Sequence, residues 1–338
     1  MKTYNIALIG CGHMGQAHLE HIYSKENVCI EYVCDRDAAR AEEFQRRYGA
    51  KNICTDAQVC ISAETVDIVI LATYPSSHLE LLKLCMQYKK HVICEKPIAK
   101  TPEEGKEFVQ LVKANPDVKV LVGYILRHNV TYQKVAEMIQ SGAIGSPIVM
   151  RMTQNHHTMD WNRYRRLLEE TPPIVDCGVH YLDVMQWFTG ATVTNMSGIG
   201  MRTEEDLPEG RNNYEMVTVT LSDGSVGFYE AGWTKTISAN NAKEFVGPQG
   251  SIRLVFAKDR TSHQEEGDLI EYYELATKTY HTINVLAERK PTDLQLEHLI
   301  RMIEQDVPAC PTIDEVYSSF RAAWKAEKNM LNEKNPRF

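Results

Sequence analysis

A glycine-rich turn near the start of the chain has the spacing of a phosphate-binding loop. Gly10, Gly12 and Gly15 form the pattern GxGxxG directly after an apolar run, residues 4–9, and directly before a stretch with helical periodicity. Gly10 would allow the tight turn, Gly12 the close approach of a pyrophosphate, and Gly15 the packing of helix on strand. The first amides of the helix would then hold the anion. This turn predicts a dinucleotide site.

An acidic residue stands where a dinucleotide site needs one. Asp35 ends the second apolar run and lies 20 positions after Gly15, where a carboxylate accepts hydrogen bonds from the adenosine ribose hydroxyls. The same carboxylate would repel a 2′-phosphate, which favours NAD. Arg36 beside it could stack on adenine or meet that phosphate, so NADP stays open.

Four further motifs follow the glycine turn in a fixed order. They are residues 72–78 after the fourth predicted strand, residues 95–97 (Glu-Lys-Pro) after the fifth, residues 123–127 after the sixth, and residues 176–183 with the pattern DxGxHxxD. In this order the chain resembles the glucose-fructose oxidoreductase and inositol dehydrogenase family, also called Gfo/Idh/MocA. The resemblance covers nearly the whole chain and implies hydride transfer between a nicotinamide and a cyclic polyol, sugar or sugar derivative.

The resemblance directs attention to a lysine that could act on the substrate hydroxyl. When NAD oxidises a secondary alcohol, a hydride leaves carbon while a base takes the hydroxyl proton. Lys96 follows the fifth strand at the carboxyl edge of the predicted sheet, where open α/β sheets bind ligands. Its ammonium could hold the substrate oxygen, lower its pKa and relay its proton.

A histidine and a carboxylate complete the expected catalytic set. Asp176 and His180 are four positions apart, which on a helix places both on one face, and Asp183 lies on the same stripe. Imidazole suits proton exchange at neutral pH, and a carboxylate can orient the ring or bind a substrate hydroxyl. The resemblance implies that His180 is the general acid/base and Asp176 its orienting group. We expect the nitrogens of Lys96 and His180 to converge on the nicotinamide.

The motifs, the resemblance and the chemistry of single side chains together indicate which residues contact cofactor and substrate. The expected cofactor-binding residues are Gly10, Gly12, His13, Met14, Gly15, Asp35, Arg36, Thr73, Tyr74, His78, Glu95 and Lys96. The expected substrate-binding residues are Lys96, Arg127, His156, Trp161, Arg163, Asp176 and His180. In the segment 156–164, Trp161 offers a face for sugar C–H groups, and His156, His157 and Arg163 can bind hydroxyls or an anionic group. Two positions depart from the family pattern, since residues 171–175 replace a glycine-rich turn and His128 replaces an aromatic residue.

Metal binding is not expected. His156 and His157 are adjacent, but no third ligand is evident in the sequence. The nine cysteines form no CxxC pair and no Cys/His ligand cluster. We interpret most of them as buried thiols in a reducing compartment, which predicts a cytoplasmic protein.

The helices and strands that must position these residues are predicted from two different patterns of apolar residues, one before and one after residue 125. Up to residue 125, short apolar runs alternate with amphipathic stretches, which is typical of βαβ units and a doubly wound parallel sheet of the Rossmann kind. The expected strands are residues 5–9, 28–34, 51–54, 67–72, 91–94 and 119–123, and the expected helices are 14–24, 37–48, 77–88 and 102–114. Thr101 and Pro102 mark the start of the last helix.

The second pattern predicts an α+β domain from residue 126 to 338. The expected helices are 129–141, 176–188, 292–305 and 313–332. The expected strands are 148–155, 192–201, 217–221, 226–233, 244–246, 251–256 and 269–275, forming a mostly antiparallel or mixed open sheet with helices on one face. The C-terminal helix could pack back on the first domain. Aromatic strand residues such as Phe228, Tyr229 and Trp233 suggest a face covered by a second copy, in a homo-dimer or homo-tetramer.

Composition excludes several other classes of protein. The chain has 338 residues, 43% hydrophobic and 24% charged, which is typical of about two globular domains. A net charge of −8 argues against nucleic acid or an anionic membrane as a partner. The longest apolar run is strand-sized, so a membrane helix is not expected. A small-molecule substrate is the partner that remains.

Two alternative functions stay open at this point. Some members of the same family hydrolyse glycosides through transient oxidation, with NAD retained and no net redox change. Others bind the dinucleotide and act as non-catalytic ligand sensors. The presence of Lys96, Asp176 and His180 argues against a sensor, because binding alone does not require a proton relay.

Overall fold

The structure of the chain is a computed structural model, and it describes residues 2–260 and 266–332. The chain forms two compact units. The first contains Met1–His128 and Lys290–Tyr317, and the second contains Asn129–Arg289 and Ser318–Phe338. Within the described residues, no helix is long and apolar enough to cross a membrane.

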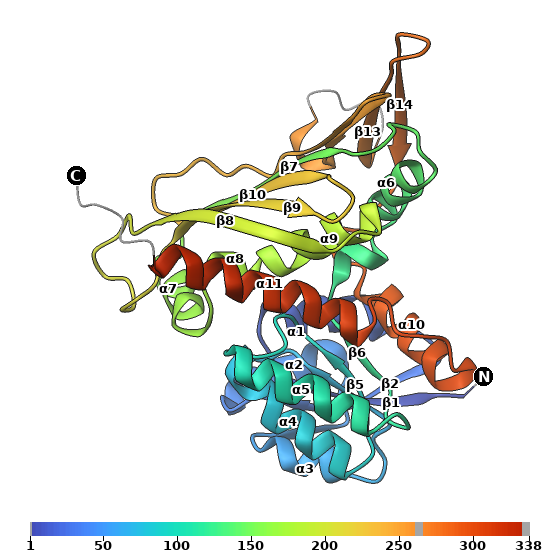
Figure 1. Ribbon diagram of the computed structural model, residues 1–338. Helices are drawn as coiled ribbons and strands as arrows, with labels where there is room; N and C mark the ends of the chain where they lie inside the picture. The colour runs from blue at the N-terminus through green and yellow to red at the C-terminus, as the bar shows by residue number, and fades with distance from the viewer. Residues whose placement is uncertain (1, 261–265, 333–338) are drawn as a thin grey trace. The chain divides into compact units, whose positions relative to one another are not determined.

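A six-stranded parallel sheet organises the first unit (Figure 1). Its strands are β1 (Tyr4–Ile9), β2 (Val28–Cys34), β3 (Asn52–Cys54), β4 (Ile68–Leu71), β5 (His91–Cys94) and β6 (Val120–Val122). They lie in the order β3-β2-β1-β4-β5-β6. The strand order reverses between β1 and β4, which is the point where doubly wound sheets bind ligands. The predicted Rossmann arrangement is confirmed.

The helices of the first unit return the chain between strands. They are α1 (His13–Ile22), α2 (Ala38–Tyr48), α3 (Ala57–Ser62), α4 (Pro75–Gln87), α5 (Pro102–Ala114) and the short 3₁₀ helix η1 (Ile125–His128). Helix α5 begins as predicted. The Thr101 hydroxyl accepts a hydrogen bond from the amide of Glu104, and the Glu104 carboxylate accepts one from the amide of Thr101. This capping box stabilises the helix start by satisfying two otherwise unpaired amides.

A segment from the far end of the chain completes the core of the first unit. Helix α10 (Thr292–Gln305) has the bounds expected from its periodicity. Its Leu296 and Leu299 are buried in the same apolar cluster as Ile93 and Leu121 of the sheet. This burial explains why residues 290–317 belong to the first unit although they begin more than 160 positions after η1 ends.

An eight-stranded sheet organises the second unit (Figure 1). Its strands are β7 (Val149–His157), β8 (Val193–Met201), β9 (Tyr214–Leu221), β10 (Val226–Thr234), β11 (Lys243–Gly247), β12 (Gly250–Val255), β13 (Asp268–Glu274) and β14 (Thr279–Val285). Their order is β14-β13-β12-β11-β7-β10-β9-β8. Only β7 and β10 pair in parallel, and every other neighbouring pair among the described strands is antiparallel. The predicted mostly antiparallel sheet is confirmed.

Helices pack on one face of this sheet. They are α6 (Val130–Gln140), α7 (Trp161–Glu170), α8 (Pro173–Asp176), α9 (Gly178–Thr189) and the part of α11 (Ile313–Asn332) that follows Tyr317. Tyr181 of α9 stacks on Tyr229 of β10 with ring centroids 4.5 Å apart, and Phe188 contacts Phe245 of β11 at 5.2 Å. These aromatic pairs fix α9 against the sheet.

The structure corrects one expectation about the aromatic strand residues. Tyr229 and Trp233 are buried in the core, while Phe228, which alternates with them along β10, is half-buried on the opposite face. Because successive side chains in a strand point to opposite faces, these three residues cannot share one face. Among them, only Phe228 remains for the open side of the sheet.

Two longer helices and an edge strand were not anticipated, and one predicted helix is interrupted. Helices α3 and α7 and strand β14 lie where no regular structure was expected. The helix expected at residues 176–188 is divided at Cys177, so that Asp176 ends α8 and His180 lies in the first turn of α9. The Cys177 backbone keeps right-handed helical angles (φ −93°, ψ −37°), so the interruption is a local tightening of the helix.

A buried histidine makes the first unit sensitive to acid. His128 Nε2 lies 2.9 Å from the carbonyl oxygen of Cys310, and the ring meets that of His298 edge-on at 5.4 Å. Burial, with a smaller contribution from His298, lowers the pKa of His128 to about 4. The folded chain therefore holds this imidazole neutral, whereas the unfolded chain protonates it near pH 6.5. The resulting stability is fully present above pH 6.5 and is lost as the pH falls toward 4.

We expect His128→Gln to reduce this acid sensitivity. Between pH 7 and pH 5 the neutral histidine should cost the wild-type protein about 2 kcal/mol of unfolding free energy, and the variant should show a flatter pH dependence. Urea unfolding at several pH values measures the effect, with exposed His281→Gln as control. Identical slopes for wild type and His128→Gln would contradict the prediction.

Candidate active site

The glycine turn adopts the geometry that its spacing predicted. Gly10 has a φ of +99°, and a side chain there would place Cβ 2.4 Å from the carbonyl oxygen of Ala72. A Cβ on Gly15 would lie 2.1 Å from the carbonyl oxygen of Gly10, so the helix can start only if both residues are glycine. Apart from Gly12 itself and its two chain neighbours, no described atom lies within 4 Å of the Cβ position of Gly12. The turn is packed tightly from inside and leaves open space where a pyrophosphate would approach.

The carboxylate of Asp35 is fixed beside this turn. Its Oδ2 accepts a hydrogen bond from the Cys11 amide at 2.8 Å, and its Oδ1 accepts one from the Asp37 amide at 2.9 Å. A carboxylate can accept about four hydrogen bonds, so ribose hydroxyls can still bind. Asp35 is partly exposed and Arg36 is exposed. This donor and acceptor set fits the adenosine end of NAD.

Lys96 lies on a turn whose neighbours are held in the interior. Glu95 is buried, and its Oε1 lies 2.7 Å from Nε2 of His18 in α1. Because a carboxylate only accepts, Nε2 carries the proton in this contact. The peptide bond between Lys96 and Pro97 is cis. Lys96 itself is only partly buried, so the turn presents the ammonium-bearing side chain while its flanks stay fixed.

His78 supports the same turn from α4. The side chain is completely buried; Nδ1 lies 3.0 Å from the carbonyl oxygen of Pro97, and Nε2 lies 3.1 Å from that of Thr73. The imidazole thus joins the segment after β4 to the segment after β5. Tyr74, expected at the mouth of the cofactor site, is 40% exposed and precedes the first turn of α4. A direct contact of either residue with the cofactor stays a prediction.

A lysine that sequence reasoning missed lies at the start of α1. Lys290 Nζ is 2.6 Å from Nε2 of His13 and 3.5 Å from Sδ of Met14. His13 and Met14 form the first turn after the glycine loop, where a pyrophosphate sits in dinucleotide sites. More than 270 positions separate Lys290 from this turn, so no local spacing could have indicated it.

Arg127 is a buried cation of the first unit. Its Nη2 lies 3.1 Å from Glu315 Oε1, and 5% of its surface is exposed. This ion pair connects η1 to the start of α11 within the unit. The expected contact between Arg127 and substrate stays a prediction.

In the second unit, Asp176 and His180 stand on either side of Cys177. Asp176 accepts a hydrogen bond from the Cys177 thiol at 3.4 Å, and the His180 amide donates to the Cys177 carbonyl at 3.1 Å. Both Asp176 and His180 are partly exposed, whereas Asp183 is buried. Lys96 belongs to the first unit, so its meeting with His180 at one nicotinamide stays a prediction.

A buried glutamate holds the helix that carries Asp176. Glu215 Oε2 accepts a hydrogen bond from the Ile174 amide at 2.7 Å, in the first turn of α8. Burial, and then the neighbouring Glu327, raise the pKa of Glu215 well above its usual value. A protonated Glu215 can still accept this bond through its carbonyl oxygen. Sequence reasoning missed this support, because Glu215 lies just before the strand expected at residues 217–221 and belongs to no predicted element or motif.

A buried lysine, Lys243, contacts the ring of Tyr181, the residue that follows His180. Lys243 Nζ contacts the carbonyl oxygen of Thr153, donates to Asn241 Oδ1 at 2.8 Å and lies 4.4 Å from the ring centroid of Tyr181. Burial lowers the pKa of Lys243 well below its usual value. These contacts fix Tyr181 and therefore the first turn of α9.

The expected pocket segment is ordered by its own contacts. Nδ1 of His156, near the end of β7, lies 2.9 Å from the hydroxyl of Tyr164 in α7. Trp161 Nε1 donates to Asp206 at 2.7 Å, and Lys235 Nζ lies 4.8 Å from the ring centroid of Trp161. Arg163 is exposed on the first turn of α7. If a sugar stacks on Trp161, it has to share the indole ring with the ammonium group of Lys235.

Fold and site together define a class of protein. A doubly wound sheet with a tight glycine turn, a carboxylate held beside that turn and a buried support for a lysine turn is typical of a dinucleotide-binding α/β oxidoreductase unit. The second unit adds a helix start with a carboxylate and an imidazole beside an open sheet.

Comparison with known proteins identifies the family. Residues 4–124 match the model of the GFO_IDH_MocA oxidoreductase family with an NAD-binding Rossmann fold, and residues 132–253 match the GFO/IDH/MocA C-terminal domain. The chain belongs to this family of NAD-binding oxidoreductases, and the resemblance expected from its motifs is confirmed.

Individual relatives are distant but extensive. An inositol 2-dehydrogenase of Rubrobacter xylanophilus is 24% identical over 253 residues, covering 74% of this chain and 70% of the relative. A D-apiose dehydrogenase of Paraburkholderia graminis is 26% identical over 273 residues, covering 79% and 72%. The crystal structure of an Agrobacterium radiobacter oxidoreductase, in complex with NAD⁺, L-tartaric acid and magnesium, superposes with a TM-score of 0.80 at 20% identity, covering 98% of each chain.

The position of Lys290 yields a prediction about cofactor affinity. We expect Lys290→Met to raise the dissociation constant of NAD about tenfold, about 1.4 kcal/mol, because it removes a cation from the pyrophosphate end of the site. Fluorescence titration with NAD measures the effect. Lys290→Arg should retain most of the affinity, and Lys106→Met on the exposed side of α5 should change nothing. Equal affinity of Lys290→Met and wild type would contradict the prediction.

Proposed function

We propose that this protein oxidises a secondary hydroxyl of a cyclic polyol, sugar or sugar derivative and transfers the hydride to NAD. The observation that carries the proposal is the lysine turn after β5. Glu95 and the Lys96–Pro97 peptide are anchored by His18 and His78, while Lys96 is left partly exposed. Family membership supports the use of NAD.

Lys96 acts on the substrate oxygen. An ammonium that donates to a hydroxyl stabilises the alkoxide character that develops as the proton leaves. A lysine on a mobile surface loop would lose backbone entropy each time it met the substrate, whereas the anchored turn restricts the backbone beforehand. Bound NAD supplies the hydride acceptor, and the protein supplies proton transfer and orientation.

His180 takes the hydroxyl proton, and Asp176 orients the imidazole or the substrate. Both side chains are partly exposed at the junction of α8 and α9, two helices that Glu215 and Lys243 hold in place. Imidazole is the side chain whose protonation changes most readily near neutral pH, which suits it to accept this proton. We propose that Arg127, His156, Trp161 and Arg163 contribute to substrate binding.

Two features support the choice of substrate and cofactor. Relatives that span about three quarters of the chain are named as dehydrogenases of inositol and of D-apiose, which are a cyclic polyol and a sugar. The fixed carboxylate of Asp35 favours the free ribose hydroxyls of NAD over the 2′-phosphate of NADP.

We expect Lys96→Met and His180→Ala to lower the turnover number by roughly 10² to 10⁴, the usual contribution of a proton-transferring group. The dissociation constant of NAD should change by less than about threefold, since neither side chain is assigned to hold the pyrophosphate. The assay incubates each protein with NAD and a panel of inositols, sugars and glycosides, and follows NADH absorbance and released aglycone. Lys106→Met serves as the matched control.

The same assay separates the alternatives. Net NADH formation supports the dehydrogenase. Aglycone release without NADH would instead identify a hydrolase, and saturable ligand binding with neither product would identify a sensor. Parallel loss of turnover and NAD affinity in both variants would contradict the assigned roles.

We also propose that the protein is a cytoplasmic homo-dimer or homo-tetramer. All nine cysteines are unbridged, which supports a reducing compartment. The sheet face opposite the helices carries exposed apolar side chains, among them Ile199 and Met201 of β8 and Val149 and Val226 on the paired strands β7 and β10. Such a face is favourable to bury against a second copy.

The assembly can be broken from this face. We expect Ile199→Lys combined with Met201→Lys to convert the oligomer to monomers, because 57% and 60% of these side chains are exposed within a single chain. Light scattering after size-exclusion chromatography gives the mass. Thr194→Lys, exposed at the end of the same strand, serves as the charge control. A monomeric wild type would contradict the proposal.

A further inference from the structure

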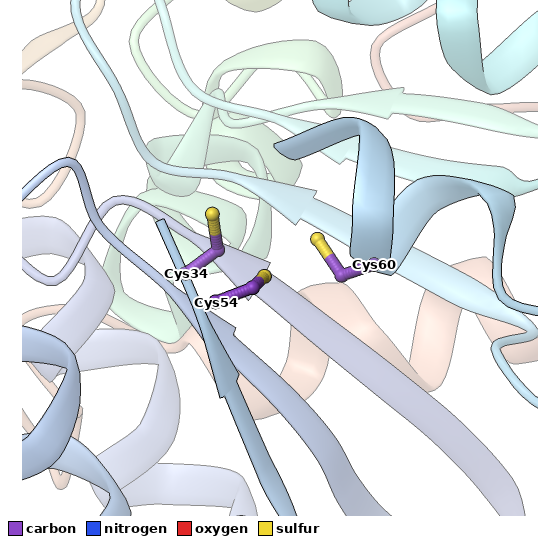
Figure 2. A group of neighbouring side chains, drawn as sticks. All are labelled: Cys34, Cys54 and Cys60. Carbon is purple, nitrogen blue, oxygen red and sulfur yellow. The ribbon is translucent and has the colours of Figure 1, made fainter. Parts of the chain in front are cut away.

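Three cysteines that are unremarkable in the sequence meet in the first unit. Cys34 ends β2, Cys54 ends the neighbouring β3, and Cys60 lies in α3. Their Sγ atoms all lie within 4.8 Å of one another (Figure 2). We call these three residues the thiol cluster. Its members come from three elements, so the convergence is a product of the tertiary fold.

The backbone fixes the positions of the three thiols. Cys34 and Cys54 are register partners in the parallel pair β2–β3. Helix α3 starts immediately after β3, capped by Asp56, whose carboxylate accepts from the Gln58 amide at 2.9 Å. The Cys60 thiol donates to the Ala57 carbonyl at 3.2 Å. The sulfur atoms are therefore held together without a bridging bond, since all three cysteines are free.

The spacing suits coordination of one ion. A metal–thiolate bond to zinc is about 2.3 Å, so thiolates around one such ion stand roughly 3.8 to 4.0 Å apart. Contraction of the thiol cluster by less than about 1 Å reaches this geometry. Cys34 and Cys60 are buried, whereas Cys54 is partly exposed and gives an ion access from solvent.

The alternative explanation is packing of small apolar side chains. Free cysteine is commonly buried for that reason. Cys85 and Cys94 of the same unit fit that description, because they are buried without belonging to such a group. The thiol cluster differs because its three soft donor atoms share one space and one of them reaches the surface.

We propose that Cys34, Cys54 and Cys60 bind one thiophilic d¹⁰ cation, copper(I) or zinc(II), through three thiolates. Soft thiolate ligands select these ions over magnesium or calcium. Binding releases the thiol protons and changes no oxidation state. With three protein ligands, copper(I) would be trigonal and zinc(II) would add a water molecule as its fourth ligand.

The experiment uses the full chain, freshly reduced and kept anaerobic. It is titrated separately with Cu(I) in acetonitrile and with Cd²⁺, a spectroscopic substitute for zinc, while ultraviolet thiolate-to-metal charge-transfer absorbance is followed. We expect saturation at one equivalent with at least one of the two probes. Copper-only saturation assigns the site to copper(I), and cadmium saturation with competition by Zn²⁺ assigns it to zinc(II).

Single variants test the ligands. Cys54→Ser, at the partly exposed position, should weaken binding at least 100-fold while circular dichroism confirms the fold. Cys34→Ser and Cys60→Ser should do the same. Cys29→Ser, on β2 but outside the thiol cluster, should bind like wild type. Absence of one-equivalent saturation with both probes, or unchanged binding by Cys54→Ser, would overturn the proposal.

Discussion

The buried contact between His18 and Glu95 joins the helix that follows the glycine turn to the turn that carries Lys96. His18 lies in α1, whose first turn follows the glycine loop, and Glu95 immediately precedes Lys96. Both side chains are almost fully buried, so breaking the contact would leave a polar group without solvent. The position of helix α1 and the position of the lysine turn are therefore not independent. If either the helix or the turn moved away, the hydrogen bond between His18 and Glu95 would be lost.

This constraint explains glycines that the turn geometry alone does not. A Cβ on Gly123 would lie 3.0 Å from Glu95 Oε2, which is closer than side chains normally approach. Gly123, the residue after β6, thus has no side chain because the Glu95 carboxylate beside it must keep its contact with His18. Gly178 plays a comparable part in the second unit, where a Cβ would meet Ile174 Cδ1 at 2.9 Å and Tyr229 at 3.2 Å. The absence of a side chain at Gly178 therefore allows α8 and α9 to pack closely against the sheet.

The sequence predicted the features that depend on local chain chemistry. The glycine spacing, the capping box at Thr101 and the period of the apolar residues are local signals, and β2, β5, α5, α10 and α11 have the predicted bounds. Short elements were missed for a physical reason. Helix α3 has six residues, too few to display a helical period, and β14 is exposed on both faces along much of its length and lacks alternation.

The remaining parts of the site depend on contacts between distant residues. Lys290 meets the glycine turn because Leu296 and Leu299 of α10 contribute to the same core as β5 and β6. Glu215 meets Ile174 because β9 lies under α8, and the thiol cluster forms because β2 and β3 are register partners. In each case the residue types are ordinary and the chemistry comes from proximity. Motif spacing cannot encode that proximity, since burial of apolar surface elsewhere in the chain determines it.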